Sequence, residues 1–336
     1  MSATDVGAAL PRAKLEILPA LAPVIVAAVA APFIGSFSTF ATLTLASLAM
    51  GMMIFTMASG LTLAFGMMDI LNFGHGAFIA LGAYVATVVI LPLTAWADAD
   101  SVGLNLAVFA AVLIGAAVVS GLLGYVFERV LIVPVYGQHL KQILVTIGGS
   151  IVAEQLLYAL FGPEQIPITP PATFRGSFVL GDAAIEKYRV VAFVVGLAVF
   201  LAQMVVLNRT KIGLLIRAGV ENREMVEALG YRIDRLFVGV FMAGSALAGL
   251  GGVLWALYQG QVRASMGGEL LVLCFIVIII GGLGSVTGCL IGATLVSLIA
   301  NYAGFLAPKL ALVSNILLMV VVLLWRPRGL YPLGAR

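Results

Sequence analysis

The chain has 336 residues, of which 62% are hydrophobic and 10% charged, and its mean hydropathy is +1.16. Soluble domains carry about 25% charged residues, so this composition excludes a soluble globular protein and indicates an integral membrane protein. The net charge of +3 requires no nucleic-acid partner. Cys274 and Cys289 lie in apolar, glycine-rich sequence, which predicts packing residues and neither a disulfide, a metal site nor a redox cofactor.

Ten apolar segments follow one another along the chain, and most are long enough for a helix to cross about 30 Å of hydrocarbon. They cover residues 17–35, 40–65, 74–93, 104–127, 142–161, 190–207, 237–257, 268–282, 289–306 and 310–325. The sequence therefore predicts an all-α, polytopic transmembrane helix bundle with about eight to ten spanning helices in contact with membrane lipid. We expect residues 1–336 to form a single domain.

The polar segments at 128–141 and 208–236 and the tail at 326–336 fall on one side of the membrane if every segment crosses it. Together with the N-terminus, that side would hold thirteen of the eighteen lysines and arginines. Basic residues concentrate on cytoplasmic loops, so both termini are predicted to be cytoplasmic.

The longest of these cytoplasmic segments, 208–236, contains an amphipathic helix predicted from Leu214 to Leu229. Arg217 precedes Glu221 by four residues, and Arg223 precedes Glu227 by four, a spacing that places opposite charges on neighbouring turns. Gly230 is a plausible helix stop. Such a helix can cover the ends of the membrane helices, or it can be the docking element for a cytosolic protein.

Glycine-rich stretches interrupt two of the apolar segments. The first, from Gly66 to Gly76, includes Asn72, Gly74 and His75, and the second, from Gly281 to Gly288, includes Gly282 and Gly284. Irregular backbone at membrane depth survives only inside protein or beside a water-filled cavity. Broken helices at corresponding places often mark a transport pathway. We expect both breaks to lie towards the cytoplasmic side.

Within the first break, the glycines beside His75 allow the backbone to turn before a helix that we expect to begin near Ala77. Asn72 can satisfy backbone groups that the break exposes. His75 either forms a structural hydrogen bond across the break or takes part in gating. No catalytic arrangement is evident, and we predict that the chain is not an enzyme.

Glu154 lies near the middle of the segment 142–161. A carboxylate at that depth is costly unless it faces the bundle interior or meets a partner, so we expect Glu154 to point inward. It then either forms a buried interhelical hydrogen bond or lines the translocation route. An ion-coupled carrier would also place an acid there or at Asp69.

The chain carries no phosphate-binding loop of its own. That motif ends in Gly-Lys-Ser/Thr, and none of the lysines follows a glycine. We therefore expect no ATP site and no cofactor in this chain.

Four stretches taken in order carry a resemblance that covers nearly everything after about residue 40. They are MMDILNFGHGAFIALGAYVATV, ILVTIGGSIVAEQLLYALFGP, IRAGVENREMVEALGYRIDRL and IIIGGLGSVTGCLIGATL. Together they resemble the permease subunit of the branched-chain amino acid ABC importers, in particular its LivH-type member.

The resemblance implies a type II importer fold in the bacterial inner (plasma) membrane. It also implies a second related permease, in a heterodimer, two cytosolic ABC ATPases and a periplasmic solute-binding protein. Glu227, Ala228 and Gly230 are similar to the loop by which ABC permeases contact their ATPases. The implied activity is ATP-driven import of leucine, isoleucine and valine by alternating access.

Other functions stay open at the level of sequence. An importer of the same type can carry urea, short amides or aromatic acids. An ion-coupled secondary transporter and a passive channel are further alternatives, but neither has an evident use for the charged segment 208–236.

Overall fold

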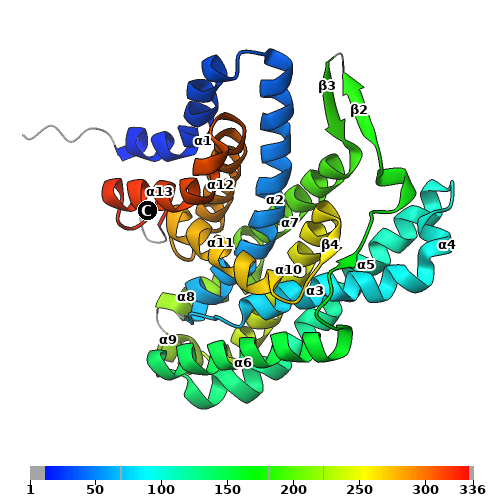
Figure 1. The fold of residues 1–336 in the computed structure, drawn as a ribbon. Coiled ribbons are helices and arrows are strands. Elements are labelled where there is room, and N and C mark those ends of the chain that lie inside the picture. The colour runs from blue at the N-terminus through cyan, green and yellow to red at the C-terminus, as the bar shows by residue number, and fades with distance from the viewer. Residues whose placement is uncertain (1–11, 69, 181, 222, 333–336) are drawn as a thin grey trace, which may run out of the picture.

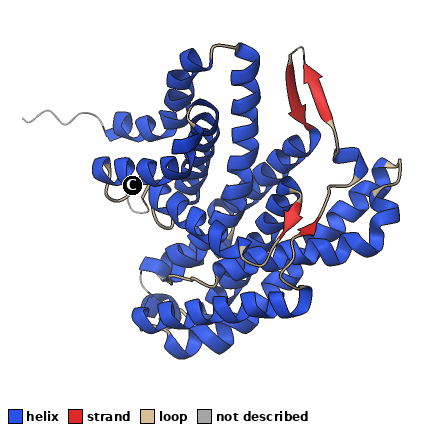
Figure 2. Ribbon diagram, in the orientation of Figure 1, coloured by secondary structure: helices blue, strands red, loops and turns tan. Residues whose placement is uncertain are grey.

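The computed structural model describes residues 12–68, 70–180, 182–221 and 223–332, so Asp69 lies outside the described residues. The chain forms a bundle of helices, with a few short strands at its margin (Figures 1 and 2). Seven of the helices in the described ranges are long and apolar enough to cross a membrane, and three shorter ones are also apolar. The predicted all-α polytopic bundle is therefore confirmed.

Ten apolar helices coincide with the ten predicted segments. In chain order they are α1 (Arg12–Ile34), α2 (Phe37–Met68), α3 (His75–Ile90), α5 (Val102–Phe127), α6 (His139–Phe161), α7 (Lys187–Arg209), α10 (Ile233–Gln259), α11 (Met266–Gly281), α12 (Val286–Leu306) and α13 (Pro308–Trp325).

The remaining elements are short. Three helices lie between the apolar ones: α4 (Thr94–Ala97), α8 (Lys211–Glu221) and α9 (Arg223–Ala228). Short 3-10 turns cover Leu91–Leu93, Val133–Val135 and Ala172–Phe174. Strands β2 (Ser177–Leu180) and β3 (Ala183–Glu186) form an antiparallel hairpin, and β1 (Ile166–Pro167) pairs antiparallel with β4 (Gln261–Val262).

The structure differs from the sequence prediction in two polar segments. Helix α5 does not stop at Phe127 but continues through a π-helical turn at Glu128–Ile132. Ile132, which is fully buried, anchors this extension, whereas Val130 is exposed. The helix expected over 214–229 is present as α8 and α9, on either side of residue 222, which is not described.

The centre of the bundle consists of α2, α3 and α10, which pack at glycines. A Cβ atom on Gly82 of α3 would overlap the backbone of Gly249 in α10, and one on Gly60 of α2 would overlap that of Gly244. Lipid gives helices no hydrophobic drive to associate, so close van der Waals contact between backbones holds such a bundle together. Figure 1 shows these three helices near the middle of the molecule.

Helix α10 provides a test of this packing, with a matched control on the same helix. A Cβ on Gly252 would overlap the carbonyl oxygen of Ile79, whereas one on Gly239 would meet nothing within 4 Å. We expect Gly252→Ala to cost about 1–3 kcal/mol through overpacking. Gly239→Ala should leave stability equal or slightly higher, because alanine favours helix.

Thermal unfolding of the detergent-solubilised protein, followed with a thiol-reactive dye, measures both variants. Cys274 and Cys289 are buried and free, so they react when the bundle opens. Equal midpoints for the two variants would contradict a packing role for Gly252.

Candidate functional site

The first predicted break lies between α2 and α3, and it is shorter than the sequence suggested. Gly66 is still helical, because α2 continues to Met68, and α3 begins at His75 and not at Ala77. Asn72 is buried, and its Oδ1 accepts a hydrogen bond from the backbone N–H of Gly74 at 2.9 Å. Asn72 therefore does satisfy a backbone group that the break frees.

His75 ties the break to the interior of α2. Its side chain is buried, and Nε2 lies 2.9 Å from the carbonyl oxygen of Met57. Met57 is eleven residues before the end of α2 at Met68, which corresponds to about 16 Å along the helix axis. His75 thus lies well inside the bundle, deeper than a helix end at the surface, and forms the cross-break hydrogen bond that was one of its two expected roles.

The second break separates α11 from α12 and spans residues 282–285. Gly282 and Gly284 have φ angles of 102° and 79°, which residues with a Cβ rarely adopt. The Oγ of Ser285 accepts a hydrogen bond from the N–H of Gly288 at 3.1 Å and so caps α12. Gly281 and Gly288 pack backbone to backbone across the turn.

The fold brings the two breaks together, although about 200 residues separate them in sequence. A Cβ on Gly66 would overlap the backbone of Gly284, and Gly76 packs on the backbone of Gly267 in α11. The rings of Phe73 and Phe275 lie 5.0 Å apart between their centroids. The contacts at Gly66 and Phe73 therefore join the first break to the second, whereas Gly76 contacts the first turn of α11, about 21 Å along that helix from Gly281.

The C-terminal segment after α13 completes this region, and the sequence analysis did not anticipate it. The N–H groups of Leu330 and Tyr331 donate to the carbonyl oxygens of Ile280 and Gly281, each at 2.8 Å. A Cβ on Gly329 would lie 2.5 Å from the Cα of Gly282. Gly329 was the one feature of the sequence that could have indicated a turn in this tail, because it follows a Pro-Arg pair; its φ is 82°.

Glu154 lies apart from the breaks. Helix α6 reaches the first break at Thr146, whose Oγ1 accepts from the N–H of Phe73 at 3.3 Å, and Glu154 is about 12 Å further along the helix. Only 11% of the apolar window of α6 is buried in this chain, against 83% for α2. The interior of this chain does not enclose Glu154, which is partly exposed on a peripheral helix beside the exposed Gln155, so its inward orientation stays a prediction.

The segment 208–236, which we call the coupling segment, is hydrogen-bonded to the C-terminal end of α7. Arg217 donates from a guanidinium nitrogen to the carbonyl oxygen of Leu207 at 3.0 Å, and from Nε to that of Gly213 at 3.3 Å. A side chain at Gly213 would overlap the backbone of Leu207, so glycine permits this tight turn. The side chains of Glu221 and Arg223 lie outside the described residues, and the two predicted ion pairs are therefore not observed.

Helix α9 ends at Ala228, two residues before the predicted stop at Gly230, which has a φ of 86°. The N–H groups of Gly230 and Tyr231 donate to the carbonyl oxygens of Glu227 and Val226, a common way to close a helix. Val226 is buried, whereas the apolar side chains around it are exposed: Leu214, Met225, Leu229 and Tyr231. Exposed apolar residues on a segment that is predicted to be cytoplasmic favour a surface for a protein partner.

A polytopic bundle in which two interrupted helices meet inside the protein is the architecture of a membrane transport subunit. The family described as the permease component of branched-chain amino acid transport systems matches residues 43–324. The chain belongs to this family, and the resemblance found in its sequence is confirmed.

Named relatives agree with this assignment. The high-affinity branched-chain amino acid transport system permease protein LivH of Escherichia coli K12 is 27% identical over 280 residues, covering 81% of this chain and 89% of LivH. BraD of Pseudomonas aeruginosa, a permease protein of the same description, is 29% identical with the same coverage. LivM of Escherichia coli K12 is 27% identical over 93% of this chain and 74% of its own length. No solved structure matches the chain.

Proposed function

We propose that this chain is a membrane-spanning permease subunit of an ATP-driven ABC importer in the bacterial inner membrane. It translocates leucine, isoleucine and valine by alternating access. The observation that carries the proposal is the family match over residues 43–324, supported by relatives named for high-affinity branched-chain amino acid transport.

The energy for import comes from partner ATPases on the cytosolic side. The segment of α8 and α9 offers them an exposed apolar surface, and Arg217 joins that segment to the end of α7. A displacement of α8 by the ATPases is therefore transmitted to α7 through hydrogen bonds and close packing. Arg217, Glu221, Arg223, Glu227 and Gly230 remain the proposed coupling residues.

The second permease covers the outer face of α6. Glu154 and Gln155 expose polar atoms midway along a spanning helix, where contact with lipid costs several kcal/mol for a carboxylate. A second membrane-spanning chain with polar groups removes that cost. The likeness to both LivH and LivM is consistent with a pair of related permeases. The translocation pathway then runs between the two permeases, with Glu154 on its wall.

The contact between the two breaks provides an element that can move during transport. It joins α3 to α11 at Gly76 and Gly267, and the end of α2 to the second break at Gly66 and Gly284, mainly through backbone contacts at glycines. Asn72, Gly74, His75, Gly76, Gly281, Gly282 and Gly284 are the proposed residues of this element. A small rotation of α3 against the first turn of α11 would change the pathway beside these residues.

Uptake of radiolabelled leucine at low concentration tests the function. We expect uptake to fall when the gene is deleted, to return on complementation, and to disappear after ATP depletion. Unchanged leucine uptake in the deletion strain would overturn the proposed substrate, and the same assay would then use urea, short amides and aromatic acids. Uptake that follows an ion gradient and ignores ATP depletion would indicate a secondary transporter.

Leu229→Lys tests the ATPase docking surface, and Val179→Lys in β2 is its matched control. The two side chains are 71% and 72% exposed, and only Leu229 belongs to the proposed surface. A lysine on an apolar interface leaves a charge without a partner, so ATPase co-purification should fall about tenfold or more for Leu229→Lys. Equal recovery of the ATPase with both variants would show that this surface does not bind it.

A photo-crosslinking residue tests the permease interface. With benzoylphenylalanine in place of Gln155, we expect an adduct with the second permease, detected as a larger band by immunoblotting. The same residue in place of Leu324 in α13, which is 82% exposed, should not give that adduct. A permease adduct only from position 324 would place the interface on α13 and contradict the assignment to α6.

A further inference from the structure

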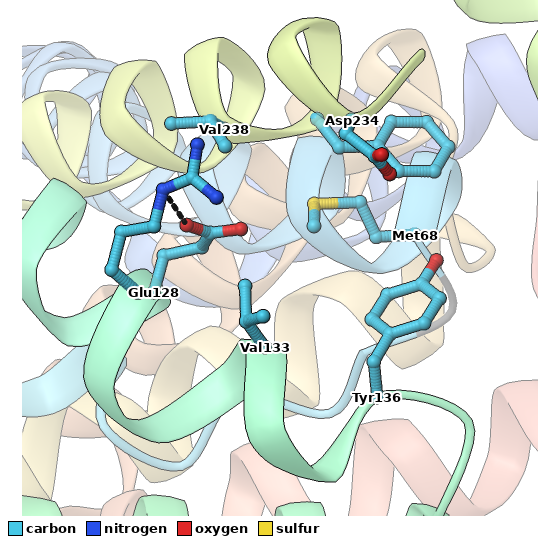
Figure 3. A pocket seen from close by; sticks show the side chains of 8 residues that line it. Met68, Glu128, Val133, Tyr136, Asp234 and Val238 are labelled. Carbon is cyan, nitrogen blue, oxygen red and sulfur yellow. Dashed lines mark ion pairs between the residues drawn. The ribbon is translucent and has the colours of Figure 1, made fainter. Parts of the chain in front are cut away.

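A cavity of about 240 Å³ lies where the C-terminal end of α2, the π-helical turn after α5 and the first turn of α10 meet. All three elements end or begin on the side that the basic residues assign to the cytoplasm. Figure 3 shows Glu128, Asp234 and Tyr136 around this cavity, with Met68 between the two carboxylates in this view. Glu128, Asp234 and Tyr136 belong neither to the breaks nor to the docking surface, and Met68 is the last residue of α2 before the first break.

Glu128 is the unusual member of the cavity wall. Its side chain is only 5% exposed, and its Oε2 atom has no hydrogen-bond donor among the described residues. The nearest cation is Arg129, whose Nε lies 3.7 Å from Oε2, which is too long for a hydrogen bond. A buried carboxylate oxygen without a donor is costly, so this atom is suited to a ligand that brings N–H groups.

The charges around the cavity favour a zwitterion. Asp234 adds a second carboxylate from α10, and the C-terminal end of α2 contributes the negative end of its helix dipole. Both features attract a cationic group towards Glu128. Arg129, half-exposed at the rim, supplies a positive charge for an anionic group of the same ligand.

The remaining wall is apolar, and the cavity is small. Its apolar side chains come from four residues: Met68, Val133, Phe237 and Val238. A volume of 240 Å³ is below the range of about 300–1,000 Å³ for drug-sized ligands and corresponds to about eight waters. Two carboxylates, one guanidinium and an apolar wall in that volume match a single amino acid with an apolar side chain.

We propose that this cavity is a cytoplasm-facing binding site for an aliphatic α-amino acid. The ammonium group lies between Glu128 and Asp234, the carboxylate faces Arg129, and the side chain packs on the apolar wall. Because Asp234 lies in the first turn of α10, shortly after α9, an occupied site holds the start of α10 against the end of α5. Imported amino acid that binds there slows further import.

Binding of radiolabelled leucine to the purified transporter complex, without the solute-binding protein, tests the site. Glu128→Gln and Asp234→Asn should each weaken binding about tenfold or more, because each removes a charged acceptor for the ammonium group. Glu164→Gln makes the same chemical change at an exposed carboxylate in the loop after α6 and should bind like the wild type. Equal affinity in all four proteins would overturn the proposal.

Competition on the wild-type complex keeps the test valid if a variant fails to fold. Leucinamide, which keeps the ammonium group, should displace leucine far better than 4-methylpentanoate, which lacks it. Displacement by 4-methylpentanoate as effective as by leucinamide would show that the carboxylates do not hold an ammonium group, and would also overturn the proposal.

The choice of leucine as the probe rests on the proposed function. Transport assays test the binding site and the importer assignment separately. In vesicles preloaded with leucine, ATP-driven uptake should be slowed for the wild type and Glu164→Gln, and less so for Glu128→Gln, each relative to its own uptake without preloading. If preloading never slows uptake, the proposed inhibition by internal amino acid is contradicted, while the importer assignment stands. Absence of uptake with leucine binding that depends on Glu128 supports the site and overturns the importer assignment.

Discussion

Close backbone contact at glycines is the interaction on which the rest of this structure depends. In a membrane, burial of apolar side chains gives no net drive for helices to associate, so packing must come from surfaces that fit at short range. The pairs Gly60–Gly244 and Gly82–Gly249 bring α2 and α3 against α10 with no side chain between them. The same kind of contact, at Gly66 and Gly76, seats the first break against α11 and the second break.

This mode of packing has a consequence for movement. Backbone surfaces joined through glycine do not interlock as long side chains do, so two such surfaces can exchange contacts at small cost. His75 opposes that freedom at one point, because its bond to the carbonyl oxygen of Met57 fixes the start of α3 to the middle of α2. The region of the breaks thus combines a few directional hydrogen bonds, among them those of Asn72, His75 and Ser285, with several non-directional backbone contacts, which suits the element that we propose to move during transport.

The polar groups of the membrane region divide between two surroundings. Asn72, His75 and Thr146 find partners inside the chain, and their burial is thereby compensated. Glu154 and Gln155 find none there, and they lie on a helix that the chain leaves largely uncovered. Since lipid cannot satisfy a carboxylate, the outer face of α6 is the surface on which we propose that the second permease lies.

The sequence alone determined the membrane-spanning class, the ten apolar helices, the positions of both breaks and the end of α9 near Gly230, because each depends on local hydropathy or on the backbone freedom of glycine. It could not determine that the two breaks meet, that residues 329–331 cover the second one, or that Glu128 is buried while Glu154 is half-exposed. Those features arise from contacts between segments far apart in the chain. Which face of a helix meets protein is decided by all its neighbours together, and a hydropathy pattern records only how apolar the helix is.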